Sequence, residues 1–214
     1  MNEREFKGFG GITLRAQLRG LADDPSVLLI HGEGQDRQVW AQITEALVKA
    51  GRHVISLDLR GHGRSDRATD GRYEFGVLVE DLRAVLAQLA SRPVIVGAAL
   101  GGWIGAAAIG EDGGHLASGL VLADAPPELD RAAAAQLRSD IERQVSAPSA
   151  SPAFDPKFVT AMDLEAASQR VSQAARHIKL PVLFVRGALS DIGDAAVVGR
   201  YVEEIGRASC RERV

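Results

Sequence analysis

The 214-residue sequence has a single cysteine and no long apolar run. Because one cysteine cannot form an internal disulfide bond, Cys210 favours a reducing compartment, and we expect a cytoplasmic protein. No apolar stretch approaches the roughly 20 residues that a membrane-spanning helix needs. The opening residues, Met1 to Glu5, are rich in charge and have no apolar signal-peptide core. These features predict no membrane partner.

An excess of one charge sign is also lacking. The 25 basic residues are scattered among 28 acidic ones and the formal net charge is -3, which argues against a nucleic-acid partner. The histidines and carboxylates lack the H-x-x-x-H or cysteine spacing of a metal site. The loop from His31 to Gly34 lacks the third glycine of a dinucleotide-binding fingerprint. We therefore expect neither a metal ion nor another cofactor.

The chain instead alternates short apolar runs with segments of helical periodicity. This alternation predicts an α/β protein with a mostly parallel sheet flanked by helices. Residues 12–18 alternate apolar and polar side chains and suit an early antiparallel edge strand. The other predicted strands cover 26–30, 53–57, 93–96, 118–123 and 181–187, and the predicted helices cover 36–50, 77–89 and 103–109.

A different composition marks residues 128–178. Helical stretches rich in alanine and glutamine surround a segment at 146–156 that is dense in serine, alanine and proline, which is typical of a linker inside a helical insertion. We therefore divide the chain into a core of residues 1–127 and 179–203, a small helical insertion at 128–178 and a tail at 204–214.

Three small residues after the strand at 93–96 form the most informative motif. Gly97, Ala99 and Gly101 match the frame G-x-S-x-G, with alanine where a serine nucleophile would stand. Glycines on both sides of the central residue let the strand and the following helix approach each other in a sharp turn. Alanine keeps this shape and removes the reactive hydroxyl. Taken alone, such a turn also suits a phosphate-binding loop or simple packing.

Two further motifs precede the turn, and together the three resemble those of the α/β-hydrolase family. They are His31-Gly32 after one strand, the D-x-R-G-x-G-x-S pattern from Asp58 to Ser65 after the next, and the Gly97 to Gly101 frame after the third. The resemblance extends from about Phe6 to about Val202. It implies an α/β-hydrolase fold and acyl transfer to water by a serine, a histidine and an acid.

The resemblance assigns roles to residues at matching positions. The nucleophile would stand at Ala99, and the backbone N–H groups of Glu33 and Leu100 would hold the oxyanion. Because backbone donors do not depend on side-chain identity, we expect this half of the site to be intact. Asp191 matches the catalytic acid, although an aspartate there also suits a helix N-cap. Asp124, at the end of the preceding strand, is the alternative acid.

In this family, an insertion at the position of residues 128–178 forms a cap that lies over the pocket and selects substrates. Its apolar side chains either line the substrate pocket or belong to the core of the cap itself. The partner implied by the resemblance is a small-molecule substrate or ligand. The candidate pocket residues are Phe154, Phe158, Val159 and Met162.

The general base of such a site is missing from the sequence. The family order along the chain is nucleophile, acid and histidine, and no histidine follows Asp191. We expect structural or solvated roles for all five histidines, which are His31, His53, His62, His115 and His177.

The tail from Glu204 to Val214 offers an explanation for the missing histidine. It lacks an amphipathic pattern and can be encoded by a string that resembles a short-read sequencing adapter translated in frame. We therefore hypothesise a gene interrupted near Glu203, with a natural basic tail as the alternative, and we expect the last strand and helix of the family to be missing. The run from Val182 to Val185 would then be an unpaired apolar edge strand, prone to self-association.

Three functional interpretations remain. In the first, the parent protein hydrolyses a small ester, lactone, epoxide or similar substrate, and this chain is an inactive, truncated form. Epoxide opening usually needs aspartate at the turn, so the frame favours an original serine. In the second, Ala99 is native and the domain binds a small ligand without turnover. In the third, Ala99 is an engineered change that traps substrate.

Overall fold

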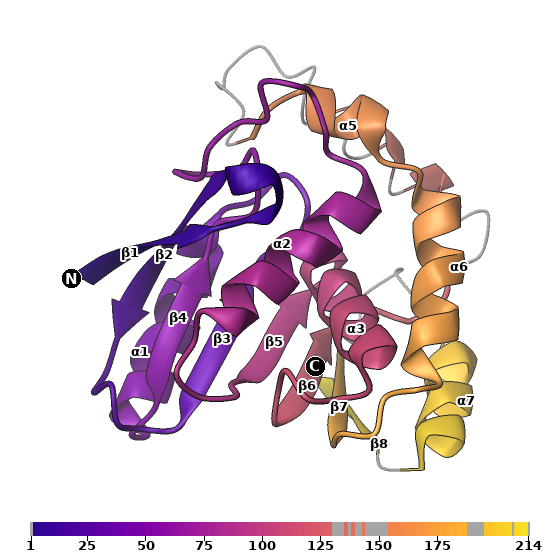
Figure 1. The fold of residues 1–214 in the computed structure, drawn as a ribbon. Helices are drawn as coiled ribbons and strands as arrows, with labels where there is room; N and C mark the ends of the chain where they lie inside the picture. The colour runs from indigo at the N-terminus through magenta and orange to yellow at the C-terminus, as the bar shows by residue number, and fades with distance from the viewer. Residues whose placement is uncertain are drawn as a thin grey trace.

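The computed structural model describes residues 2–129, 135–136, 138–139, 143, 154–187, 195–206 and 208–213. These residues form an eight-stranded sheet in the order β1-β2-β4-β3-β5-β6-β7-β8 (Figure 1). The strands are β1 (Asn2–Lys7), β2 (Thr13–Arg19), β3 (Ser26–Ile30), β4 (His53–Leu57), β5 (Val94–Ala98), β6 (Gly119–Ala123), β7 (Val182–Gly187) and β8 (Ala208–Arg213).

The sheet is mostly parallel, which confirms the predicted fold class. Strands β4, β3, β5, β6, β7 and β8 run parallel to one another, while β2 pairs antiparallel with both β1 and β4. The sequence did not predict β1, because its side chains are exposed apart from Phe6 and so carry little apolar pattern. Residues 2–7 form a strand because they pair with β2, and not because of their own composition.

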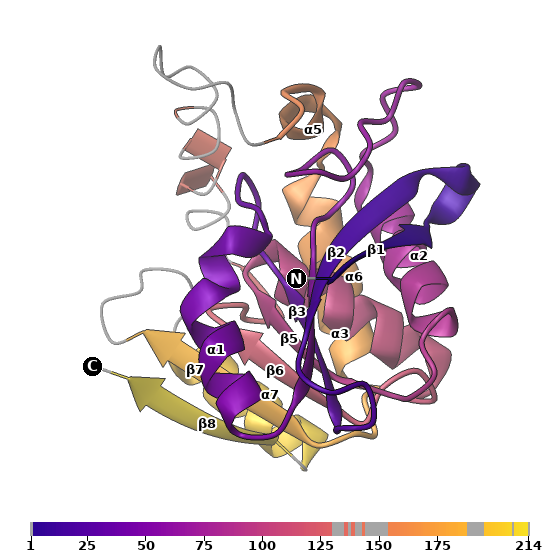
Figure 2. The same cartoon turned by 90° about the vertical axis from the view of Figure 1, so that its left-hand side faces the viewer.

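Helices cover both faces of the sheet (Figure 2). Helix α1 lies on one face, and helices α2 and α3 lie on the other. The short 3-10 helix η2 (Arg37–Trp40) and α1 together occupy the span of the single helix predicted at 36–50. The helices are α1 (Ala41–Lys49), α2 (Phe75–Ala87), α3 (Leu100–Asp112), α5 (Lys157–Ala161), α6 (Leu164–Ala175) and α7 (Ala195–Ile205).

The described part of the predicted insertion consists mainly of α5 and α6. Helix α6 packs directly on α3, so closely that a Cβ atom added at Gly110 would lie 2.1 Å from the carbonyl oxygen of Ala174. Helix α7 contacts α6 as well, and the hydroxyl groups of Ser172 and Tyr201 are 2.6 Å apart. Within the described residues, no helix is long and apolar enough to cross a bilayer.

The expectation that β7 is an unpaired edge strand is wrong. Residues 208–213 form β8, which pairs in parallel with β7 along its whole length, from Val182 opposite Ala208 to Gly187 opposite Arg213. The last strand that we expected to be missing is therefore present and β8 forms the edge. Its polar composition hid it, because an edge strand needs no continuous apolar run. The hypothesis that a sequencing adapter encodes residues 204–214 is a statement about the DNA, and the structure does not test it.

A buried ion pair fixes the loop after β4 to helix α2. The guanidinium group of Arg60 donates two hydrogen bonds to Asp81, at 2.7 and 2.8 Å, and both side chains are almost fully buried. Asp81 also accepts a 2.7 Å hydrogen bond from the backbone N–H of Phe9, and Arg60 donates to the carbonyl oxygen of the same residue. Three segments of the chain therefore meet at one charge pair.

We predict that Asp81→Ala lowers the free energy of unfolding by about 3 to 5 kcal/mol, because it leaves the Arg60 charge buried without a partner. The matched control is Glu204→Gln, which breaks the exposed pair with Arg176 and should cost less than about 1 kcal/mol. Urea unfolding followed by circular dichroism measures both. Equal costs for the two variants would contradict the importance of the buried pair.

Candidate functional site

The turn between β5 and α3 places Ala99 in a strained backbone conformation. Its φ is 43° and its ψ is -116°. Asp124, directly after the neighbouring strand β6, has a φ of 45°. Among the described residues these are the two non-glycine residues with positive φ, a conformation that costs free energy and is concentrated at functional sites.

Close backbone contacts hold this turn in place. A Cβ atom on Gly97 would lie 2.4 Å from the backbone nitrogen of Gly102, and one on Gly101 would lie 2.4 Å from the carbonyl oxygen of Ile30. The backbone N–H of Ala99 donates a 3.0 Å hydrogen bond to Ala123 of β6. The two glycines of the motif are thus required by packing, as the frame predicts.

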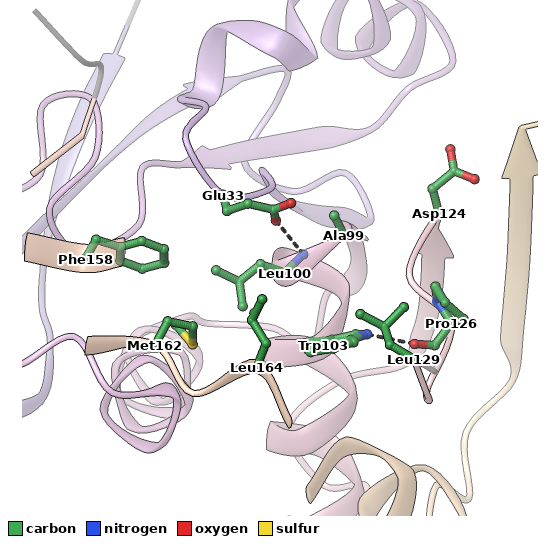
Figure 3. A pocket seen from close by; sticks show the side chains of 10 residues that line it. All are labelled: Glu33, Ala99, Leu100, Trp103, Asp124, Pro126, Leu129, Phe158, Met162 and Leu164. Atoms are coloured by element: carbon green, nitrogen blue, oxygen red, sulfur yellow. Dashed lines mark hydrogen bonds between the residues drawn. The ribbon is translucent and has the colours of Figure 1, made fainter. Parts of the chain in front are cut away.

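A pocket opens at this turn, between the carboxyl ends of the central strands and the segment that carries α5 and α6 (Figure 3). Its walls are mainly apolar. Phe158 and Met162, both proposed from the sequence, line it, whereas Val159 and Phe154 are not among the lining residues. The lining residues are Glu33, Ala99, Leu100, Trp103, Asp124, Pro126, Leu129, Phe158, Met162 and Leu164.

Phe154 instead packs on a buried histidine. Its ring is stacked on His62 with the ring centroids 5.3 Å apart, and Phe158 meets the same imidazole edge-on at 4.8 Å. A backbone hydrogen bond of 2.8 Å from Asp155 to Gly61 and a 2.8 Å bond from the Tyr73 hydroxyl to the Asp155 carboxylate complete the contact. These contacts hold the segment before α5 against the loop after β4.

The predicted oxyanion hole contains a side chain. The carboxylate of Glu33 accepts a hydrogen bond of 3.3 Å from the backbone N–H of Leu100 (Figure 3). Burial raises the pKa of Glu33, and the backbone N–H groups of Glu33 and Leu100 partly offset that effect. We expected the backbone donors of the oxyanion hole to be independent of side-chain identity. This is wrong for Leu100, because the side chain of Glu33 accepts its N–H hydrogen bond. A glutamate in the loop after the first parallel strand was the sequence signal for this arrangement.

Of the two candidate acids, the structure describes Asp124 but not Asp191. Asp124 lines the pocket, and its Oδ1 accepts a 2.9 Å hydrogen bond from the backbone N–H of Gly187 at the end of β7. Asp191 lies outside the described residues. In the described part of the chain, the Asp124 carboxylate has no hydrogen bond to a histidine.

The two histidines nearest the motifs use both ring nitrogens for backbone contacts. His31 Nε2 accepts from Leu59 N–H at 3.0 Å, which leaves Nδ1 to donate to the carbonyl oxygen of Gly32 at 2.7 Å. His62 Nε2 likewise accepts from Gly34 N–H at 3.3 Å, and its Nδ1 donates to the carbonyl oxygen of Arg60 at 2.9 Å. Both rings are therefore neutral and structural, in agreement with the role expected from the sequence.

The D-x-R-G-x-G-x-S motif also builds the scaffold. The Asp58 carboxylate accepts hydrogen bonds from the backbone N–H groups of Arg37, at 2.8 Å, and Arg64, at 3.0 Å. Burial raises the pKa of Asp58. Ser65 donates a 2.6 Å hydrogen bond to the carbonyl oxygen of the same aspartate. In the part of the chain that the structure describes, no three histidine, cysteine, aspartate or glutamate side chains gather to hold a metal ion.

We predict that Gly101→Ala lowers the free energy of unfolding by about 3 kcal/mol, because its methyl group would collide with backbone oxygens that cannot move independently. Gly105→Ala in the same helix is the control. The nearest atoms there are side-chain methyl groups at 3.2 and 3.3 Å, and the better helix propensity of alanine offsets part of the cost. Thermal and urea unfolding should show a change within about 1 kcal/mol for this control.

We predict a loss of stability as the pH falls from about 6.5 towards 4. Burial lowers the pKa of His31 to about 4, and burial and the neighbouring His31 lower that of His62 to about 3. The unfolded chain therefore takes up protons first, at an ordinary pKa near 6.5, and each pKa unit of difference corresponds to about 1.4 kcal/mol. Melting temperatures at pH 7.5 and 5.0 measure the effect.

The variant His62→Gln should show a smaller decrease in melting temperature between these two pH values than the unmodified chain. His177→Gln, at an exposed position, should leave the decrease unchanged. An identical pH dependence in all three proteins would show that the buried imidazoles do not control it.

Comparisons with known proteins agree with this geometry. The chain is 37% identical over 103 residues to the non-heme chloroperoxidase CPO-A1 of Kitasatospora aureofaciens and 36% identical over 113 residues to the esterase Rv0045c of Mycobacterium tuberculosis. The alignments cover 47% and 51% of this chain but only 37% and 36% of the relatives. The chain thus matches little more than a third of the length of these relatives.

Solved structures share the fold across nearly the whole chain. The esterase RhEst1 from Rhodococcus aligns with a TM-score of 0.75 and 22% identity, covering 99% of this chain and 90% of that one. A structure from a study of the carboxylesterases of Nitrososphaera gargenis aligns with a TM-score of 0.78 and 17% identity, covering 98% and 89%. A family model described as alpha/beta hydrolase fold matches residues 25–203. The chain belongs to the α/β-hydrolase fold family.

Proposed function

We propose that this scaffold is that of a hydrolase for small ester-like substrates, and that this chain does not form the acyl-enzyme intermediate. The observation that carries the proposal is Ala99, which occupies a strained turn at the wall of an apolar pocket. A residue in this position presents its side chain at the carboxyl end of the sheet, where a serine hydroxyl would attack a carbonyl carbon. The methyl group of alanine cannot form that bond.

The remaining parts of an acyl-transfer site support the same scaffold. Leu100 begins helix α3, so its N–H group is free of helical hydrogen bonds and suits a developing oxyanion. Asp124 and Asp191 are the candidates for the acid that would orient a histidine. The names of the similar proteins, an esterase and carboxylesterases among them, favour ester-like substrates.

The segment that carries α5 and α6 is the proposed cap. It contributes Phe158, Met162 and Leu164 to the pocket, all of which are nearly fully buried. Apolar walls of this kind accept the hydrocarbon part of a substrate and exclude water from the reacting carbonyl group. The substrates that fit this wall are small molecules with an apolar body.

A second candidate function is ligand binding without turnover. The observation that favours it is the Glu33 carboxylate on the N–H group of Leu100, the donor that an oxyanion would need. A pocket with alanine in place of the nucleophile and an occupied oxyanion donor retains its shape for binding. An engineered origin of Ala99 leads to the same expectation of binding without an acyl-enzyme.

We predict that Ala99→Cys, made together with Cys210→Ser to remove the native thiol, reacts with p-nitrophenyl acetate to release one equivalent of p-nitrophenol. A cysteine thiolate is nucleophilic without a histidine, and the N-terminus of α3 favours the thiolate. The rate of this burst should exceed that of Cys210→Ser alone at least tenfold. Ala99→Ser should give no burst, because a serine hydroxyl needs a general base.

The positional control is Ala98→Cys in the same Cys210→Ser background. Ala98 ends β5 and is not among the residues that line the pocket. Intact-mass spectrometry locates the acetyl group on the chain. Acetylation at position 98 that is as fast as at position 99 would show that the turn does not present a nucleophile to the pocket.

A further inference from the structure

Among the described residues, the charged side chains that line the pocket are acidic. Among the described residues that line it, Glu33 and Asp124 are the charged ones, and the others are apolar. Glu33 reaches from the loop after β3 to the start of α3, and Asp124 lies at the end of β6 beyond Ala99 (Figure 3). The described part of the lining thus offers carboxylate oxygens as acceptors and no basic side chain.

The carboxylate of Glu33 also occupies the N-terminus of α3, where an anionic group of a ligand would otherwise bind. It accepts the hydrogen bond of Leu100, 67 residues away in the chain, at 3.3 Å. The N-terminus of α3 would otherwise attract a carboxylate or an oxyanion through its free N–H groups and its partial positive charge. With Glu33 in this position, an incoming carboxylate meets a like charge across a site of low dielectric constant.

We propose that Glu33 makes this pocket selective for a small ligand with an apolar body and a protonated amine as its head group. The inference rests on the proposed binding function of the pocket. The hydrocarbon part packs among Trp103, Phe158 and Met162, and the ammonium group donates hydrogen bonds to the Glu33 carboxylate. Asp124 adds negative charge to the same pocket, and a carboxylate ligand of equal size is rejected by repulsion.

The pocket contains its own reporter of binding. Trp103 lines it, and the indole N–H of this residue donates a 2.7 Å hydrogen bond to the carbonyl oxygen of Pro126, another lining residue. The chain has two tryptophans, so a spectrum of ¹⁵N-labelled protein shows two indole signals. The variant Trp40→Phe identifies which signal belongs to Trp103.

The experiment titrates the full chain with n-butylammonium, n-butanol and n-butyrate at pH 7 while following the indole signal of Trp103. We expect n-butylammonium to bind at least tenfold more tightly than n-butyrate, with n-butanol between them. Glu33→Gln keeps a side-chain oxygen near Leu100 but removes the charge, and should abolish the preference for the amine. Glu33→Gly frees the N–H group, so n-butyrate should then bind at least as tightly as n-butylammonium.

Glu45→Gln, at an exposed position on α1, is the matched control and should keep the order of the unmodified chain. Equal affinities for the three probes in the unmodified chain, or a preference for the amine that survives Glu33→Gln and disappears only in Asp124→Asn, would overturn the role of Glu33. An indole signal of Trp103 that none of the probes shifts in any variant would overturn both this inference and the binding function. A burst in Ala99→Cys would still support the hydrolase scaffold in that case.

Discussion

The close approach of β3, β5 and helix α3 is the constraint on which the site depends. Gly97 and Gly101 allow backbone atoms to meet where a side chain would collide, and the chain must then turn sharply at Ala99. The sheet hydrogen bond from Ala99 to Ala123 and the packing of α3 hold the strained conformation, because a residue with positive φ persists only when its surroundings determine it. The arrangement is present with an alanine at position 99.

The same approach brings Glu33 to the start of α3. A hydrolase scaffold uses this place for charge that develops during the reaction. Here the side chain of Glu33 accepts the hydrogen bond of Leu100, and burial raises its pKa. The fold around the pocket is therefore that of the family, while the polarity of the pocket depends on side chains that the family motifs do not specify.

The contacts around His62 link the proposed cap to the core. Phe154 and Phe158 pack on an imidazole whose nitrogens are both hydrogen-bonded to backbone groups of the core loops. The position of Phe158 in the pocket wall thus depends on a neutral histidine. The hydrogen bonds of His31 and His62 agree with the structural role that the sequence predicts for them.

Most of the sheet could be predicted from the sequence because each buried strand carries its own apolar run. The edge strands could not: β1 and β8 have mainly polar side chains, and they are strands because β2 and β7 supply their hydrogen-bond partners. Similarly, helical spacing indicated the helix at 36–50 but not which residues it buries, and Val39 and Ile43 are 48% and 44% exposed.

The sequence by itself determined the turn at Ala99, since the glycines that permit it and the missing hydroxyl are local features of the chain. It also determined the order of the motifs and hence the family. Only the tertiary structure decided that Glu33 meets Leu100, that Phe154 packs on His62 and that Asp124 lies in the pocket wall. These contacts join residues far apart in the chain, and no local pattern encodes where a side chain of one loop ends relative to the backbone of another.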